Sequence, residues 1–195
     1  MGSNFRATYY KTLGMSGVEV KQAFDAMLKE EPIDIRALVK FLLRHDVPVA
    51  MQVIVWKVVL GVLPAHRHAW ERVERQRKEH FDELQRTTFV LLGRVGPEQE
   101  FTTEIIASMC ALNQSYFGHR LEMSFEHRSD PQELEHTCHV ARMFCALCPE
   151  ECDAFWLCSQ FLLHQRANPA TSEEVVKAVR AMPFPKFSLL YYFVN

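Results

Sequence analysis

The sequence has no long hydrophobic run, no surplus of basic residues and no glycine-rich phosphate loop. Apolar runs such as Val58 to Leu63 are far shorter than the ~20 residues that a membrane-spanning helix needs. Lys and Arg number 22 against 24 Asp and Glu, so no positive excess is present to neutralise the phosphates of a nucleic acid. The 48% of hydrophobic residues is instead typical of a globular domain. We predict no nucleic-acid partner and no integral membrane segment.

The chain also lacks the features of a secreted disulfide protein. No apolar signal segment opens it, and five of its six cysteines fall between residues 138 and 158 in amphipathic, helix-like sequence. We expect a cytoplasmic protein whose reduced thiols pack as small hydrophobic side chains. A zinc site is an alternative, although the spacing lacks the second matched pair of strong zinc signatures, and a cysteine nucleophile is another. The candidate zinc ligands are Cys145, Cys148, Cys152, His136 and His139.

What the sequence does contain is helical periodicity, with no convincing alternating strand, so the predicted fold class is all-α. Two capping boxes, Ser16 with Glu19 and Thr171 with Glu174, mark helix starts. The segment 48–60 is apolar nearly all round, which predicts a buried helix at the centre of the fold. The predicted helices cover 16–28, 34–43, 48–60, 66–92, 98–113, 131–148, 152–165 and about 171–182.

The helix predicted over 66–92 is long and rich in charge. Acid-first pairs at i,i+4 support it, and His66 and His68 at its start are expected to be solvated. Its thin apolar stripe, interrupted by Arg77, is either a surface for a partner helix or the side that faces the domain core. The candidate partner-binding residues are Trp70, Val73, Arg77, Phe81 and Leu84.

The last residues, 187–194, are strongly apolar, which is unusual for a terminus. Such side chains normally pack against later parts of a domain. We therefore expect a fragment or a shortened form of a longer domain.

Two segments resemble the TBC domain, the all-helical Rab GTPase-activating module. Residues 55–64, Val-Trp-Lys-Val-Val-Leu-Gly-Val-Leu-Pro, are similar to its opening fingerprint, and residues 153–157, Asp-Ala-Phe-Trp-Leu, are similar to a later helix. The resemblance implies a single TBC-like helical domain over 1–195, with a first lobe and an incomplete second lobe, truncated on its C-terminal side. The fingerprint residues, to which the resemblance gives structural roles, are Trp56, Lys57, Gly61, Pro64, Asp153 and Trp156.

Catalysis in this family depends on an arginine in I-x-x-D-x-x-R and a glutamine in Y-x-Q, which serve phosphoryl transfer. No isoleucine of this sequence has Asp three residues later, and no tyrosine has Gln two residues later. Gln52 also stands where the fingerprint usually has arginine. We therefore expect no catalytic residue, no enzyme activity and no cofactor. The alternative is an active Rab GTPase-activating protein that uses Arg128 or Arg142 as a substitute.

Within the family, three features are similar to the TBC-domain subunits of tuberous sclerosis complexes: Asn4-Phe5-Arg6, Tyr9-Tyr10 and the Pro64-Ala65-His66 join. This resemblance implies a non-catalytic scaffold that binds the hamartin coiled coil, together with tuberin. It would support Rheb-directed GTPase activation and restraint of TOR signalling. A small GTPase of the Rab or Rheb type is a further implied partner. The expected location is cytoplasmic, at lysosomal or vesicle membranes through these partners.

Overall fold

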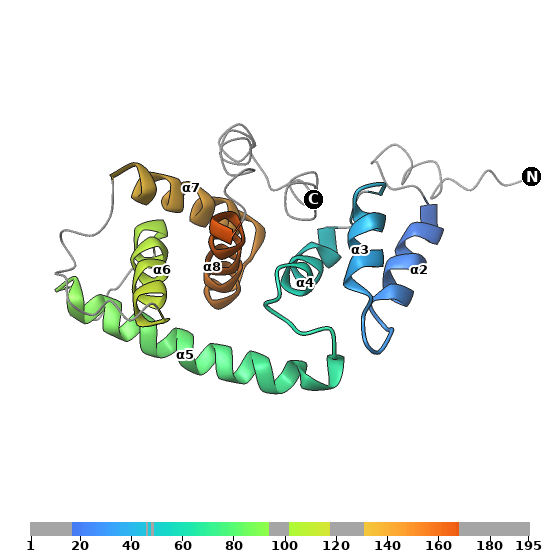
Figure 1. The fold of residues 1–195 in the computed structure, drawn as a ribbon, viewed down its shortest axis with the longest axis horizontal. Helices are drawn as coiled ribbons and strands as arrows, with labels where there is room; N and C mark the ends of the chain where they lie inside the picture. The colour runs from blue at the N-terminus through green and yellow to red at the C-terminus, as the bar shows by residue number, and fades with distance from the viewer. Residues whose placement is uncertain (1–16, 46, 48, 94–101, 118–130, 168–195) are drawn as a thin grey trace, which may run out of the picture. The chain divides into compact units, whose positions relative to one another are not determined.

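The computed structural model describes residues 17–45, 47, 49–93, 102–117 and 131–167, and their regular elements are all helices (Figure 1). The all-α prediction is therefore confirmed. Ser16, the second capping box, Arg128 and the apolar segment 187–194 lie outside the described residues. No helix within these ranges is long and apolar enough to cross a membrane.

The helices follow the predicted ranges closely. The largest difference concerns the one predicted over 98–113, which is described from Thr103, where the Thr102 hydroxyl accepts a hydrogen bond from the Ile105 amide at 3.4 Å. It ends at Phe117, four residues beyond the predicted end. The elements are α2 (Gly17–Met27), α3 (Ile35–Leu42), α4 (Val49–Val59), the 3-10 helix η1 (Arg67–Ala69), α5 (Trp70–Leu91), α6 (Thr103–Phe117), α7 (Pro131–Leu147) and α8 (Glu151–Ala167).

The chain divides into two compact units. Among the described residues, unit 1 comprises those up to Glu71 and unit 2 comprises those from Arg72 onward. Helix α5 begins in unit 1 and continues through unit 2. A single TBC-like domain over the whole chain stays a prediction.

Unit 1 is built on the apolar faces of α2, α3 and α4. Asp34 caps α3, because its Oδ1 accepts a hydrogen bond from the Ala37 amide at 2.9 Å. Phe24 of α2 meets Phe41 of α3 edge to face, with ring centroids 4.8 Å apart. In α4, Trp56 is completely buried, whereas Ile54 is only half-buried. Burial at Trp56 agrees with the predicted central helix, but α4 is not enclosed on every side.

Unit 2 packs α6, α7 and α8 against one another (Figure 1). Phe144 of α7 and Phe161 of α8, both fully buried, have ring centroids 5.7 Å apart. The buried thiols of Cys110 in α6 and Cys158 in α8 lie 4.0 Å apart. These contacts give unit 2 a continuous apolar core, against which the second part of α5 packs.

Candidate functional site: helix α5 and the turn that precedes it

The fingerprint segment forms a tight turn at the end of α4. Gly61 has φ +73°, a left-handed conformation that glycine adopts at helix ends without steric cost. The chain then folds back, and the Leu63 amide donates a hydrogen bond to the Lys57 carbonyl at 2.8 Å. Both Lys57 and Leu63 are buried. The geometry is consistent with a structural role for this part of the fingerprint.

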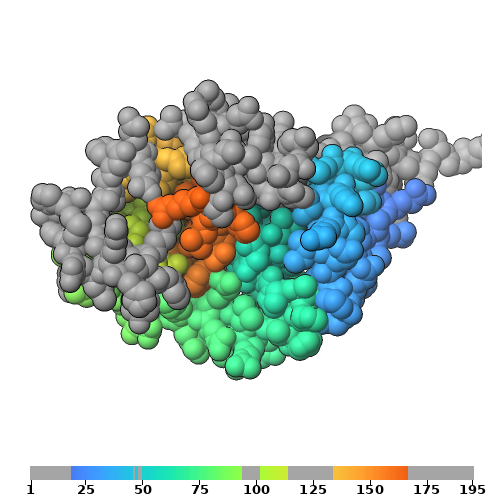
Figure 2. All heavy atoms as spheres, viewed as in Figure 1, coloured from blue at the N-terminus to red at the C-terminus, as the bar shows by residue number. Residues whose placement is uncertain are grey.

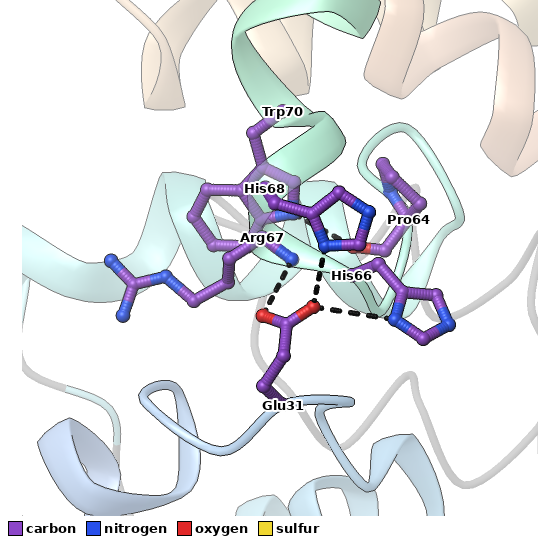
Figure 3. A network of polar contacts seen from close by, with 6 residues as sticks. All are labelled: Glu31, Pro64, His66, Arg67, His68 and Trp70. Carbon is purple, nitrogen blue, oxygen red and sulfur yellow. Dashed lines mark hydrogen bonds and ion pairs between the residues drawn. The ribbon is translucent and has the colours of Figure 1, made fainter.

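The same turn holds the first residue of α5. The Trp70 indole Nε1 donates a hydrogen bond to the Pro64 carbonyl at 2.7 Å, and the Arg67 guanidinium lies 5.2 Å from the Trp70 ring centroid (Figure 3). The Ile33 amide also donates to the Ala65 carbonyl at 2.9 Å, which attaches the turn to the loop before α3. Trp70 is therefore engaged within unit 1.

Further along α5, two residues of the predicted stripe contact α8. The Arg77 guanidinium lies 4.5 Å above the Trp156 ring, and the Trp156 indole donates a hydrogen bond to the Arg77 carbonyl at 3.1 Å. Phe81 is only 2% exposed, and its ring centroid lies 5.7 Å from that of Phe155. Burial lowers the pKa of Arg77, although the group remains charged. The contact with the Trp156 ring explains how the charged Arg77 side chain is accommodated within an otherwise apolar stripe.

A polar contact continues this interface between α5, α6 and α8. His80 Nε2 lies 3.2 Å from the Asn113 side-chain oxygen, and the Asn113 amide donates to the Ser159 hydroxyl at 3.3 Å. Asn113 and Ser159 are buried, so these hydrogen bonds satisfy groups that would otherwise be costly to bury. The His80 ring also lies 5.6 Å from the Trp156 ring. Within unit 2, helix α5 is thus fixed to α6 and α8 by apolar, cationic and polar contacts.

The candidate partner-binding residues lie on the less exposed side of α5. Phe81 is buried, while Trp70, Val73, Arg77 and Leu84 are half-buried. Their burial fits the alternative that the stripe faces the domain core, and partner binding by them stays a prediction.

The other side of α5 is an exposed face. Its residues recur at intervals of four and three, so they form one continuous line along the helix. Figure 2 shows the atoms of α5, in green, at the surface. The exposed face comprises Arg72, Gln76, Glu79, Glu83, Arg86 and Val90.

The remaining predicted residues are spread over both units. Asp153 lies in the first turn of α8, where a carboxylate suits the helix dipole. Gln52 donates a hydrogen bond from its side chain to the Val47 carbonyl at 3.4 Å within unit 1. Arg142 is exposed on α7, in unit 2.

The cysteines are free thiols. Cys110, Cys148 and Cys158 are buried, and Cys138, Cys145 and Cys152 are half-buried, as expected for thiols packed as hydrophobic side chains. Burial raises the pKa of Cys145, and this disfavours its thiolate.

The histidines of the zinc alternative have other contacts. His136 Nε2 lies 3.0 Å from the Gln165 side-chain oxygen, and His139 Nδ1 lies 2.9 Å from the Glu135 carbonyl. Within the described ranges, the group with metal-binding geometry is elsewhere, at Glu31, His66 and His68. The zinc alternative at the cysteines is therefore not supported by the arrangement of its ligands.

The Glu31 group is a feature that the sequence did not indicate. His66 and His68 are exposed, as predicted, but both rings also contact the Glu31 carboxylate. The His-x-His spacing is the one signal in the sequence that could have suggested a metal site here. Nothing in the sequence pointed to Glu31, which precedes His66 by 35 residues.

Comparison with known proteins connects this fold to a family. No family model matches the chain. TBC1 domain family member 7 from Danio rerio is 31% identical over 159 residues, which are 82% of this chain and 52% of that relative. The protein of the same name from Xenopus tropicalis is 27% identical over 163 residues, 83% of this chain and 53% of the relative. The Homo sapiens protein is 38% identical over 78 residues, 40% of this chain and 27% of the relative.

The chain spans about half the length of the first two relatives. The match covers most of the chain, and the regular elements of the part that the structure describes are all helices. The resemblance to the TBC domain family is therefore confirmed: the chain is homologous to TBC1 domain family member 7 proteins over most of its length.

Proposed function

We propose that this protein is a non-catalytic TBC-type scaffold that binds the coiled coil of hamartin and, with tuberin, supports Rheb-directed GTPase activation and the restraint of TOR signalling. The observation that carries the proposal is the exposed face of α5. Along one side of a 22-residue helix, this face presents mostly charged side chains and ends in the apolar side chain of Val90. The proposed location is the cytoplasm, at lysosomal or vesicle membranes that the partners reach.

The spacing of the exposed face suits a helical partner. Residues at alternating intervals of three and four lie along one side of a helix, as do the contact positions of a coiled coil. Glu79, Glu83 and Arg86 would meet opposite charges on the flanks of the partner helices. Val90 and Leu91, which are 67% and 51% exposed, supply apolar area at the end of the line. The inward stripe would act indirectly, by holding α5 in place through Arg77 and Phe81.

The proposal also rests on two catalytic motifs that the given sequence lacks. An arginine supplied to a GTPase is worth 10³–10⁵ in rate, and the family's arginine and glutamine motifs do not occur in these 195 residues. Binding without stimulation is the function that the remaining residues support. A small GTPase of the Rab or Rheb type would then be a partner of the complex rather than a substrate of this chain.

The first experiment measures binding of the full chain to a hamartin coiled-coil segment by calorimetry. We compare wild type with the double variant Glu79→Lys, Glu83→Lys. The matched control, Glu19→Lys with Glu30→Lys, makes the same change of charge at exposed positions of unit 1.

Reversing the charges of Glu79 and Glu83 should weaken binding about 5- to 30-fold, equivalent to about 1–2 kcal/mol. High salt should reduce this difference between the variant and wild type. The control should bind within about twofold of wild type, because its charges are not part of the exposed face. Absence of any binding would overturn the proposed partner. Equal weakening in both variants would instead show that net charge, and not the exposed face, decides.

The second experiment measures GTP hydrolysis by a panel of Rab proteins and by Rheb in the presence of the chain alone. The scaffold proposal expects no acceleration. A rate gain of several decades that Arg142→Ala abolishes would overturn it and establish the active GTPase-activating alternative.

A further inference from the structure

Three side chains of unit 1 converge on one point at the surface. Glu31 lies in the loop between α2 and α3, and His66 and His68 flank Arg67 at the start of η1. The Nδ1 atoms of His66 and His68 lie 3.3 Å and 3.0 Å from the same carboxylate oxygen, Oε1 of Glu31 (Figure 3). One donor atom from each residue lies within 4.8 Å of the other two.

We propose that Glu31, His66 and His68 form a binding site for a divalent transition-metal ion of the zinc class. The donor set is two imidazole nitrogens and one carboxylate oxygen, which suits zinc and its neighbours better than calcium or magnesium. Zinc bonds of about 2.0–2.2 Å in tetrahedral geometry place two ligand atoms roughly 3.3–3.5 Å apart. The two nitrogen–oxygen distances are within a few tenths of an ångström of that separation.

The carboxylate is already oriented for this role. The Arg67 backbone amide donates a hydrogen bond to Oε2 of Glu31 at 3.0 Å, so Oε1 is the oxygen that faces the two imidazoles. Hydrogen bonds of this kind to the second carboxylate oxygen commonly fix the ligands of metal sites. The Arg67 side chain also points away from the ligands, because its guanidinium donates to the Leu28 carbonyl at 3.2 Å. The Arg67 cation therefore does not occupy the space between the three donors.

A bound ion would connect distant parts of unit 1. Glu31 is 35 and 37 residues from the two histidines, so the ion would join the loop before α3 to the segment that precedes α5. That segment already carries the Pro64–Trp70 hydrogen bond. Because a ligand that binds only the folded state stabilises it, metal binding should raise the unfolding temperature of unit 1. All three side chains are exposed, which leaves a fourth coordination position open to water.

The test uses the full chain after treatment with a chelator, titrated with Co²⁺ and then with Zn²⁺ in competition. Cobalt absorption reports the ligand type, because thiolate ligands add a charge-transfer band that nitrogen and oxygen ligands do not. The variants are Glu31→Gln and His68→Ala. The matched control is Glu30→Gln, which removes the same charge from the neighbouring exposed residue.

We expect one equivalent of cobalt, displaced by zinc, without a thiolate band. Each ligand variant should weaken binding at least about 10-fold, whereas Glu30→Gln should bind within about twofold of wild type. Binding should also weaken in acid, because protons compete with the metal ion for its ligand atoms.

Three outcomes would overturn the proposal. One is the absence of binding by well-folded protein, verified by circular dichroism. Another is a thiolate band, which would assign the metal to the cysteines. The last is equal affinity in the ligand variants and the control. None of these results bears on hamartin binding, which the exposed face of α5 carries separately.

Discussion

Replacing Trp156 by phenylalanine tests how α5 is held against α8 within unit 2. The indole of Trp156 is 8% exposed and makes two contacts with Arg77: its Nε1 donates to the Arg77 carbonyl at 3.1 Å, and its ring lies 4.5 Å from the guanidinium. Phenylalanine keeps an aromatic ring at this position but removes the donor. It also removes the five-membered ring and presents a weaker face to the cation.

The magnitude follows from three losses. The hydrogen bond contributes about 0.5–1.5 kcal/mol, and the weaker cation–π contact costs roughly 0.5 kcal/mol. The lost apolar area of the smaller ring costs about 1 kcal/mol. Together, Trp156→Phe should lower the free energy of unfolding by about 2–3 kcal/mol.

Urea denaturation followed by circular dichroism measures this change. With a slope of ~2 kcal/mol per molar urea, the midpoint should fall by about 1–1.5 M. Val90→Ala, at a position that is 67% exposed, is the control and should stay within about 0.5 kcal/mol of wild type. A double-mutant cycle with Arg77→Met isolates the contact between the two side chains, and we expect a coupling of about 0.5–1 kcal/mol. A Trp156→Phe protein as stable as wild type would refute this account of how α5 is held.

Three further predictions concern other parts of the chain. Asp34→Ala removes the cap of α3 and should cost about 1 kcal/mol in urea denaturation; no loss would mean that the 2.9 Å contact with Ala37 contributes nothing. The contact with Cys110 and burial raise the pKa of Cys158 well above its usual value, so Cys158 should resist alkylation in the native protein and react on unfolding, as mass spectrometry would show. The hydrogen bond to Asp82, 2.9 Å long, raises the pKa of Lys78. The pair should therefore stabilise the fold below about pH 10 and lose that contribution as the pH rises further, an alkaline dependence that Lys78→Met should flatten.

The helices could be predicted because their signals are local. Asp34 lies three residues before the amide that it caps, and Gly61 ends α4 by its own backbone conformation. The start of α6 was predicted less accurately. Glu98 follows a Gly-Pro pair and resembles a helix start, but Thr102 has the side chain that contacts an amide in the first turn. Periodicity thus predicted which segments are helices. The start of α6 depends instead on a single side chain, the hydroxyl of Thr102.

The site was harder to predict because its contacts join distant residues. Arg77 interrupts an apolar stripe in the sequence, and only the position of Trp156, 79 residues later in the chain, shows why a cation is accommodated there. Glu31 meets His66 and His68 because the loop before α3 and the segment before α5 come together in unit 1. Periodicity along one helix carries no information on such pairs.

The two interpretations of α5 differ in what a partner would have to displace. A partner that used Phe81 would need to replace its contact with Phe155, and re-exposing a buried phenylalanine costs about 1.5–3 kcal/mol before any gain from binding. It would also need to replace the Arg77–Trp156 contacts. A partner on the exposed face, at Glu79 and Glu83, breaks neither. Binding there requires no local opening of unit 2. The exposed face of α5 is therefore the surface at which a coiled coil could bind with the smaller cost in free energy.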